Sequence, residues 1–173
     1  MKKLFIVALF LALPGAQAQA PYAGMQTRSI KALSDQQVAD LSAGRGMGLA
    51  LAAELNGYPG PSHVLEFADK LGLTTDQRVR FQALFDAMKA ETIPLGATLI
   101  AQERELDRQF ANRTVTPEGL AASTGAIAAT QGKLREAHLK YHLSTSALLA
   151  PAQLVAYAEL RGYAAAPHPM HHH

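Results

Sequence analysis

The sequence predicts an all-α fold: a bent hairpin of two long helices with short flanking helices, assembled as a homodimer. Apolar side chains recur every three or four residues over 75–111 and 117–148, which is the period of an α-helix. Thr74 and Thr116 precede these stretches as N-cap residues. The polar turn at 112–113 is short, so the two helices are expected to be antiparallel neighbours.

The first twenty residues are typical of a cleavable secretory signal. Lys2 and Lys3 precede an apolar run at 4–13, and cleavage is expected after Ala18 or Ala20. The run is about ten residues long, against the roughly 20 that span a bilayer. We therefore expect a mature protein that is soluble in the periplasm, without stable membrane insertion. The chain has no Cys, so a metal site there must use His, Met and carboxylates.

The charge of the chain argues against one class of partner. The chain has 16 Lys and Arg and 14 Asp and Glu, and two of the lysines leave with the signal. The mature chain is therefore close to neutral. It also carries no basic patch interleaved with aromatic residues, so we expect no nucleic-acid partner.

An N-terminal arm with short helices is expected over residues 21–61. Ser34 and Gln37 have the spacing of a capping box, in which each side chain accepts a hydrogen bond from the other residue's backbone N–H. The helix that they start should end near Gly44. A second short helix is predicted over 47–55.

The helical hairpin domain is expected to cover residues 62–163. Its first helix should begin at Ser62 and end at Gly72, because Ser is a good N-cap and Gly a good C-cap. The first long helix follows directly. Thr74 and Gln77 are predicted to start it with another capping box.

The two long helices are each expected to bury one stripe. In the first, Pro94 removes a backbone hydrogen bond at a cost of about 3 kcal/mol if nothing compensates, so a kink without a break is predicted. Its stripe consists of Phe81, Phe85, Met88, Thr92, Leu95, Leu99, Gln102, Leu106 and Phe110. The stripe of the second consists of Leu120, Thr124, Ile127, Gln131, Leu134, His138, Tyr141, Thr145 and Leu148. Helices about 50 Å long need more apolar cover than one stripe gives, which is the argument for a second protomer.

One short phrase occurs twice. Leu73-Thr74-Thr75-Asp76-Gln77 opens the first long helix, and Leu149-Ala150-Pro151-Ala152-Gln153 opens a C-terminal helix that should end near Arg161. Ala150 has no hydroxyl, so only half of the second capping box can form. The phrase resembles the LTxxQ signature of the periplasmic Spy/CpxP family, whose wider circle includes ZraP-like zinc-binding proteins and CnrX-like nickel and cobalt sensors. The resemblance covers residues 58–163 and implies a dimeric helical hairpin with a chaperone or metal-responsive role.

Four side chains are candidate metal ligands. His138 and His142 lie one helical turn apart, and His63 and Glu66 form a second pair at i and i+3. A hairpin that turns near residue 114 would bring both pairs to similar heights. Three imidazoles and one carboxylate suit zinc, nickel, cobalt or copper, and no organic cofactor is expected. Met88 could add a soft ligand. In the competing interpretation these histidines are structural or surface residues without an ion.

Residues 164–173 follow an Ala/Pro linker and are expected to be disordered. His168, His171, His172 and His173 are either weak accessory metal ligands, resembling the His-rich ends of ZraP-like proteins, or an added tag. No serine-hydrolase elbow, phosphate-binding glycine loop or zinc-protease motif is present, so no enzymatic activity is expected.

Two functions remain open. The first is a soluble periplasmic metal-binding stress protein of the heavy-metal sensor or resistance type, which would act on an envelope signalling protein. The alternative is an ATP-independent periplasmic chaperone, a holdase that binds unfolded client proteins on a concave dimer face and needs no specific metal site.

Overall fold

The computed structural model describes residues 22–163, and this part of the chain is all-helical, as predicted. The predicted signal at 1–20 and the predicted tail at 164–173 lie outside the described residues. The elements are η1 (Met25–Thr27), α1 (Asp35–Ser42), α2 (Leu51–Glu54), α3 (Pro61–Glu66), α4 (Thr75–Ala111), α5 (Pro117–Ser146) and α6 (Pro151–Leu160). No helix within the described range is long and apolar enough to cross a membrane.

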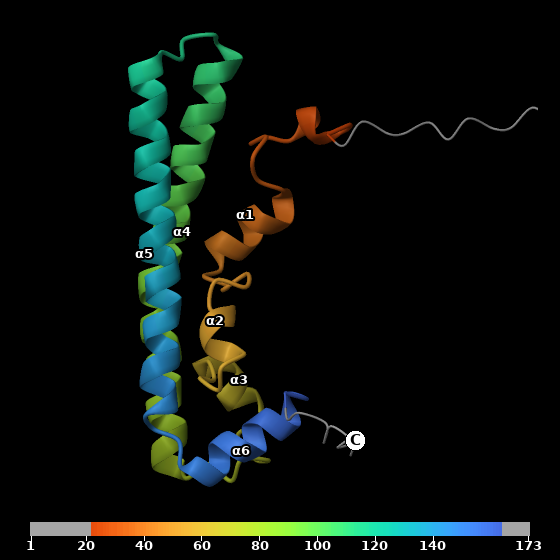
Figure 1. Ribbon diagram of the computed structural model, residues 1–173, viewed down its shortest axis with the longest axis vertical. Helices are drawn as coiled ribbons and strands as arrows, with labels where there is room; N and C mark the ends of the chain where they lie inside the picture. The colour runs from red at the N-terminus through yellow and green to blue at the C-terminus, as the bar shows by residue number, and fades with distance from the viewer. Residues whose placement is uncertain (1–21, 164–173) are drawn as a thin grey trace, which may run out of the picture.

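Helices α4 and α5 form the long antiparallel hairpin that the sequence predicts (Figure 1). The N-terminal arm does not extend away from it. Helices α1, α2 and α3 follow one another along one side of the hairpin, and α6 crosses the end opposite the hairpin turn (Figure 1). The arm and the hairpin domain therefore share one fold.

Helix α4 runs from Thr75 to Ala111 without a break at Pro94. The predicted capping box starts it: the Thr74 hydroxyl accepts from the Gln77 backbone N–H at 3.1 Å, and the Gln77 amide oxygen accepts from the Thr74 N–H at 3.1 Å. Two residues after Pro94, Gly96 faces α1. A Cβ on Gly96 would lie 2.9 Å from the carbonyl carbon of Leu41 and closer still to its oxygen. Glycine at this position therefore lets the backbones of α1 and α4 touch.

The two copies of the repeated phrase meet at the base of the hairpin. The Gln77 side chain donates to Gln153 Oε1 at 2.9 Å, and the Gln153 side chain donates to Gln77 Oε1 at 3.1 Å. Each amide also donates to a carbonyl oxygen, that of Leu148 or Leu71. Gln153 Oε1 further accepts from the backbone N–H of Ala150 at 2.9 Å, the half of the second capping box that was predicted to form. We call Gln77 and Gln153 the glutamine pair.

Two apolar clusters hold the molecule together, and the arm or α3 contributes to each. The first joins the arm to the middle of the hairpin and consists of Ile30, Leu33, Leu41, Leu99, Ile100, Ile127 and Leu134. The second joins α3 and α6 to the hairpin base and consists of Val64, Ala68, Leu71, Leu73, Phe81, Leu149 and Tyr157. The arm thus supplies apolar cover that the sequence argument assigned partly to a second protomer. The homodimer stays a prediction.

The short helices differ from their predicted bounds. Helix α2 covers only Leu51–Glu54 instead of 47–55, because Met47 and Gly48 have positive φ angles that end any helix there. Helix α3 begins at Pro61, one residue before the predicted N-cap Ser62, because proline at the first helical position already has a helical φ angle. It ends at Glu66 instead of continuing to Gly72, and residues 67–72 form turns.

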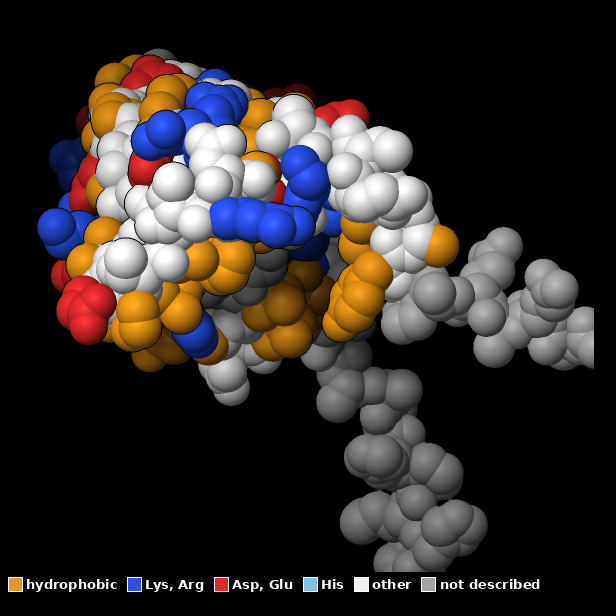
Figure 2. All heavy atoms as spheres, turned by 90° about the horizontal axis from the view of Figure 1, so that it is seen from above, with side chains coloured by type: hydrophobic (Ala, Val, Ile, Leu, Met, Phe, Trp, Pro, Cys, Tyr) orange, Lys and Arg blue, Asp and Glu red, His pale blue; other side chains and the backbone are white. Residues whose placement is uncertain are grey.

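The buried stripes also differ from the prediction near the hairpin turn. Phe110 is 54 % exposed and Leu120 is exposed as well, since the contacts of the arm with α4 extend only to Leu106 and Asp107. The predicted stripe residues Thr124 and Gln131 of α5 are also exposed. The face of the molecule at the hairpin-turn end mixes apolar, basic and acidic side chains and gathers no patch of one charge (Figure 2). On α5 the inward side chain near the base is His142 rather than Tyr141.

Candidate metal centre

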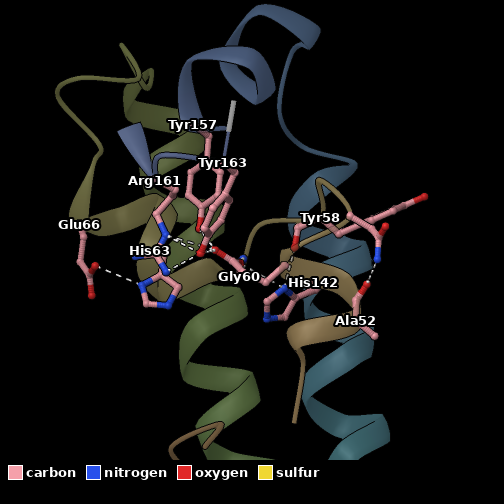
Figure 3. Close-up of polar contacts among 11 residues, drawn as sticks. Ala52, Tyr58, Gly60, His63, Glu66, His142, Tyr157, Arg161 and Tyr163 are labelled. Carbon is pink, nitrogen blue, oxygen red and sulfur yellow. Dashed lines mark hydrogen bonds and ion pairs between the residues drawn. The ribbon is translucent and has the colours of Figure 1, made fainter. Parts of the chain in front are cut away.

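Three of the four predicted metal ligands line one cavity of about 210 Å³. His138 and His142 reach it from α5 and His63 from α3, and Met88 of α4 lines it too. The fourth predicted ligand, Glu66, is turned away. Its carboxylate is 59 % exposed and lies 3.1 Å from Nδ1 of His63 (Figure 3).

The imidazole of His142 is oriented by the backbone of the segment before α3. Its Nδ1 lies 2.7 Å from the carbonyl oxygen of Tyr58, with Glu54 Oε2 at 3.7 Å (Figure 3). A carbonyl oxygen can only accept a hydrogen bond, so Nδ1 of His142 carries the proton that it donates. In the neutral form of the ring the lone pair is then on Nε2. A Cβ on Gly60 would lie 2.8 Å from Nε2, so only glycine lets the backbone lie this close to the ring. Histidines that bind a metal through one ring nitrogen usually donate a hydrogen bond from the other ring nitrogen in this way.

His138 lies one turn earlier on α5 and is 3 % exposed. Its Nε2 is buried and has no hydrogen-bond partner within the described part of the chain. Burial lowers the pKa of His138, and the neighbouring His142 lowers this pKa further, so the ring is neutral at pH 7. A buried ring nitrogen without a partner is costly and calls for an explanation, and a bound ion is one.

Glu54 is the main polar residue at this site that the sequence did not predict. The carboxylate is buried and accepts hydrogen bonds from Tyr157 Oη at 2.5 Å, Tyr163 Oη at 3.3 Å and the Gly60 backbone N–H at 3.3 Å. Arg161 Nε lies 3.3 Å away (Figure 3). Burial, and then the bond to Glu54, raise the pKa of Tyr157. Glu54 therefore fixes the end of α6 and the start of α3 around the cavity.

A glycine-rich loop forms another wall. Met47 of this loop lines the cavity, has a φ of 43°, and is 41 % exposed. Gly46 lies beside His138, since a Cβ on it would be 3.5 Å from Nδ1 of that ring. A left-handed backbone is uncommon for methionine, and such strained residues persist where the surrounding structure holds them.

The donors present at the cavity fit a transition-metal ion only in part. Among residues 22–163, no three His, Asp or Glu side chains are grouped closely enough to hold an ion. Within the described residues His138 Nε2 is buried without a hydrogen-bond partner, and His142, Met47 and Met88 line the same cavity. The competing interpretation of the sequence, without an ion, took His142 as a surface residue. In the structure His142 is buried.

The sequence found these histidines from their i, i+4 spacing but had no signal for Glu54. A glutamate in a short amphipathic segment is usually solvated, and the tyrosines that bury this one are a hundred residues away. Comparisons of the chain with protein-family models, with curated proteins and with solved structures found no match.

Proposed function

We propose that this protein is a soluble periplasmic metal-binding stress protein of the heavy-metal sensor or resistance type, similar to the Spy/CpxP-like proteins. One observation carries the proposal. Two buried imidazoles, His138 and His142, line the same small cavity, and His138 Nε2 has no hydrogen-bond partner among residues 22–163. Imidazole nitrogens with a free lone pair are the usual protein donors for zinc, nickel, cobalt and copper. The periplasmic location rests on the signal predicted over residues 1–20.

An ion in this cavity would connect elements that are far apart in the chain. His138 and His142 belong to α5 and His63 belongs to α3, while the loop of Met47 covers the site from the arm. Ligation would therefore hold the arm against the hairpin. In this proposal the fixed arm mediates metal-dependent contact with an envelope signalling protein or with a second protomer, and it needs no catalytic group.

The holdase alternative has less support from the fold. It requires an apolar concave face for unfolded clients, and the side of the hairpin that would serve is covered by Ile30, Leu33 and Leu41 of the arm. Large apolar side chains remain exposed at Leu51, Leu55 and Tyr58 around α2, and at Val79, Leu143 and Val155 elsewhere. Suppression of client aggregation without metal would favour this alternative.

The test is calorimetric titration of zinc, nickel, cobalt and copper into the chain without residues 1–20. His168, His171, His172 and His173 are replaced by Ala, so that only the cavity is measured. We expect micromolar or tighter binding, worth about 8 kcal/mol or more, that is lost in the His138→Ala/His142→Ala variant.

A matched control separates ligand loss from loss of structure. Ile127→Ala removes a buried side chain from the same helix, far from the cavity, and should cost about 2–4 kcal/mol of stability while leaving metal binding intact. Absence of binding in the parent protein, or equal loss in the control, would contradict the proposed site.

A further inference from the structure

Two methionine sulfurs share the cavity with the two buried histidines. Met88 comes from α4 and is buried, and Met47 comes from the arm loop. The cavity that they line together with His138 and His142 has a volume of about 210 Å³. Two imidazole and two thioether side chains therefore lie around one cavity. Methionine often fills core gaps, but a thioether is also a soft ligand.

Carboxylates near the cavity are already engaged elsewhere. Both oxygens of Glu54 accept hydrogen bonds, from Tyr157 and from Gly60 among others, and Arg161 balances its charge. Glu66 pairs with His63 and faces solvent. Neither Glu54 nor Glu66 is therefore free to bind an ion in the cavity, and a divalent ion at the histidines would keep most of its charge uncompensated in a buried place.

Building on the proposed metal site, we infer that its ion is soft and monovalent, Cu(I) or its analogue Ag(I), bound by His138, His142, Met47 and Met88. Thioether sulfur favours Cu(I), whereas zinc sites use His, Asp, Glu or Cys in sets of three or four. The described residues contain no such set of three His, Asp or Glu, and the methionines replace what is missing.

Met47 lies at the outer side of the site. It stands between Gly46 and Gly48, and 41 % of its surface is exposed, whereas His138, His142 and Met88 are buried. Met47 is therefore the ligand nearest to solvent in the proposed set.

The experiment measures Cu(I) affinity under anaerobic, reducing conditions by competition with a coloured Cu(I) chelator, and zinc affinity in parallel. It uses the chain without residues 1–20 and with the four tail histidines replaced by Ala. Met47→Leu and Met88→Leu keep the side-chain volume and remove sulfur, and Met25→Leu, in η1, is the matched control outside the cavity. We expect each cavity variant to lose Cu(I) affinity by about tenfold or more, with zinc affinity and the Met25→Leu protein unchanged.

A second measurement does not depend on variants. With labelled methionine methyl groups, NMR titration with Ag(I) should shift the signals of Met47 and Met88 and leave that of Met25 in place. Zinc binding that needs His138 and His142, together with Cu(I) binding that ignores both Met→Leu changes, would overturn this inference and keep the proposed function. Absence of any histidine-dependent metal binding would overturn both.

Discussion

Gly96→Ala tests whether the arm packs on the hairpin as described. A Cβ at this position would lie 2.9 Å from the carbonyl carbon of Leu41 and 3.3 Å from its Cα, and these are backbone atoms that cannot rotate away. Either α1 must shift or α4 must bend. Overpacking of this kind costs about 1–3 kcal/mol, which more than offsets the gain of about 0.5–1 kcal/mol that Ala brings to a helix interior.

The matched control is Gly125→Ala on α5, where an added Cβ would meet nothing within 4 Å. This variant should gain about 0.5–1 kcal/mol, so the two proteins should differ by about 2 kcal/mol. In urea, with a slope of about 2 kcal/mol per M, the unfolding midpoints should lie about 1 M apart. Equal stability of the two variants would show that α1 does not lie against α4 at Gly96, and the packing argument would be refuted.

Further substitutions test the polar contacts and the packing of Gly60 against His142. Glu54→Ala should cost about 3 kcal/mol or more in thermal melts, because it leaves buried hydroxyls and Arg161 without their partner; Glu54→Gln, which keeps the shape, should cost less. Tyr157→Phe should cost about 1.5–3 kcal/mol, the range for a hydrogen bond to a charged group. Because folding raises the pKa of Tyr157, the contribution of its hydroxyl to the free energy of unfolding is present below the unfolded-state pKa of about 10 and falls above it. Alkaline titration followed by tyrosinate absorbance should show one tyrosine that ionises only on unfolding. The Tyr157→Phe variant should lack this signal. Gln77→Ala and Gln153→Ala should each cost about 1–3 kcal/mol and together much less than their sum, as a double-mutant cycle in urea would reveal. Gly60→Ala would place a methyl group 2.8 Å from Nε2 of His142 and should weaken metal binding by more than about tenfold. Unchanged affinity would count against His142 as a ligand.

Local signals in the sequence were enough to predict the long helices. The capping boxes of Ser34 and Thr74 involve residues three apart, so their spacing alone predicts where α1 and α4 begin. The same holds for Thr116 and Pro117 at the start of α5. Pro94 was expected to leave α4 unbroken, and it does.

Long-range contacts were beyond the reach of such signals. The role of Gly96 depends on Leu41, which no periodicity connects to it. His142 is not in the predicted buried stripe, yet the segment before α3 covers it. For the candidate site, helical spacing predicted the three histidines of the cavity. Neither the orientation of Glu66 towards solvent nor the burial of Glu54 follows from a local pattern.

The glutamine pair has a consequence for how this sequence can vary. Each side-chain amide satisfies the other, so replacing Gln77 alone strands the amide of Gln153 among part-buried neighbours, and the reverse change does the same. The two positions are therefore expected to change together or not at all in related chains. The phrase is repeated 76 residues apart because its two glutamines form one contact between the starts of α4 and α6.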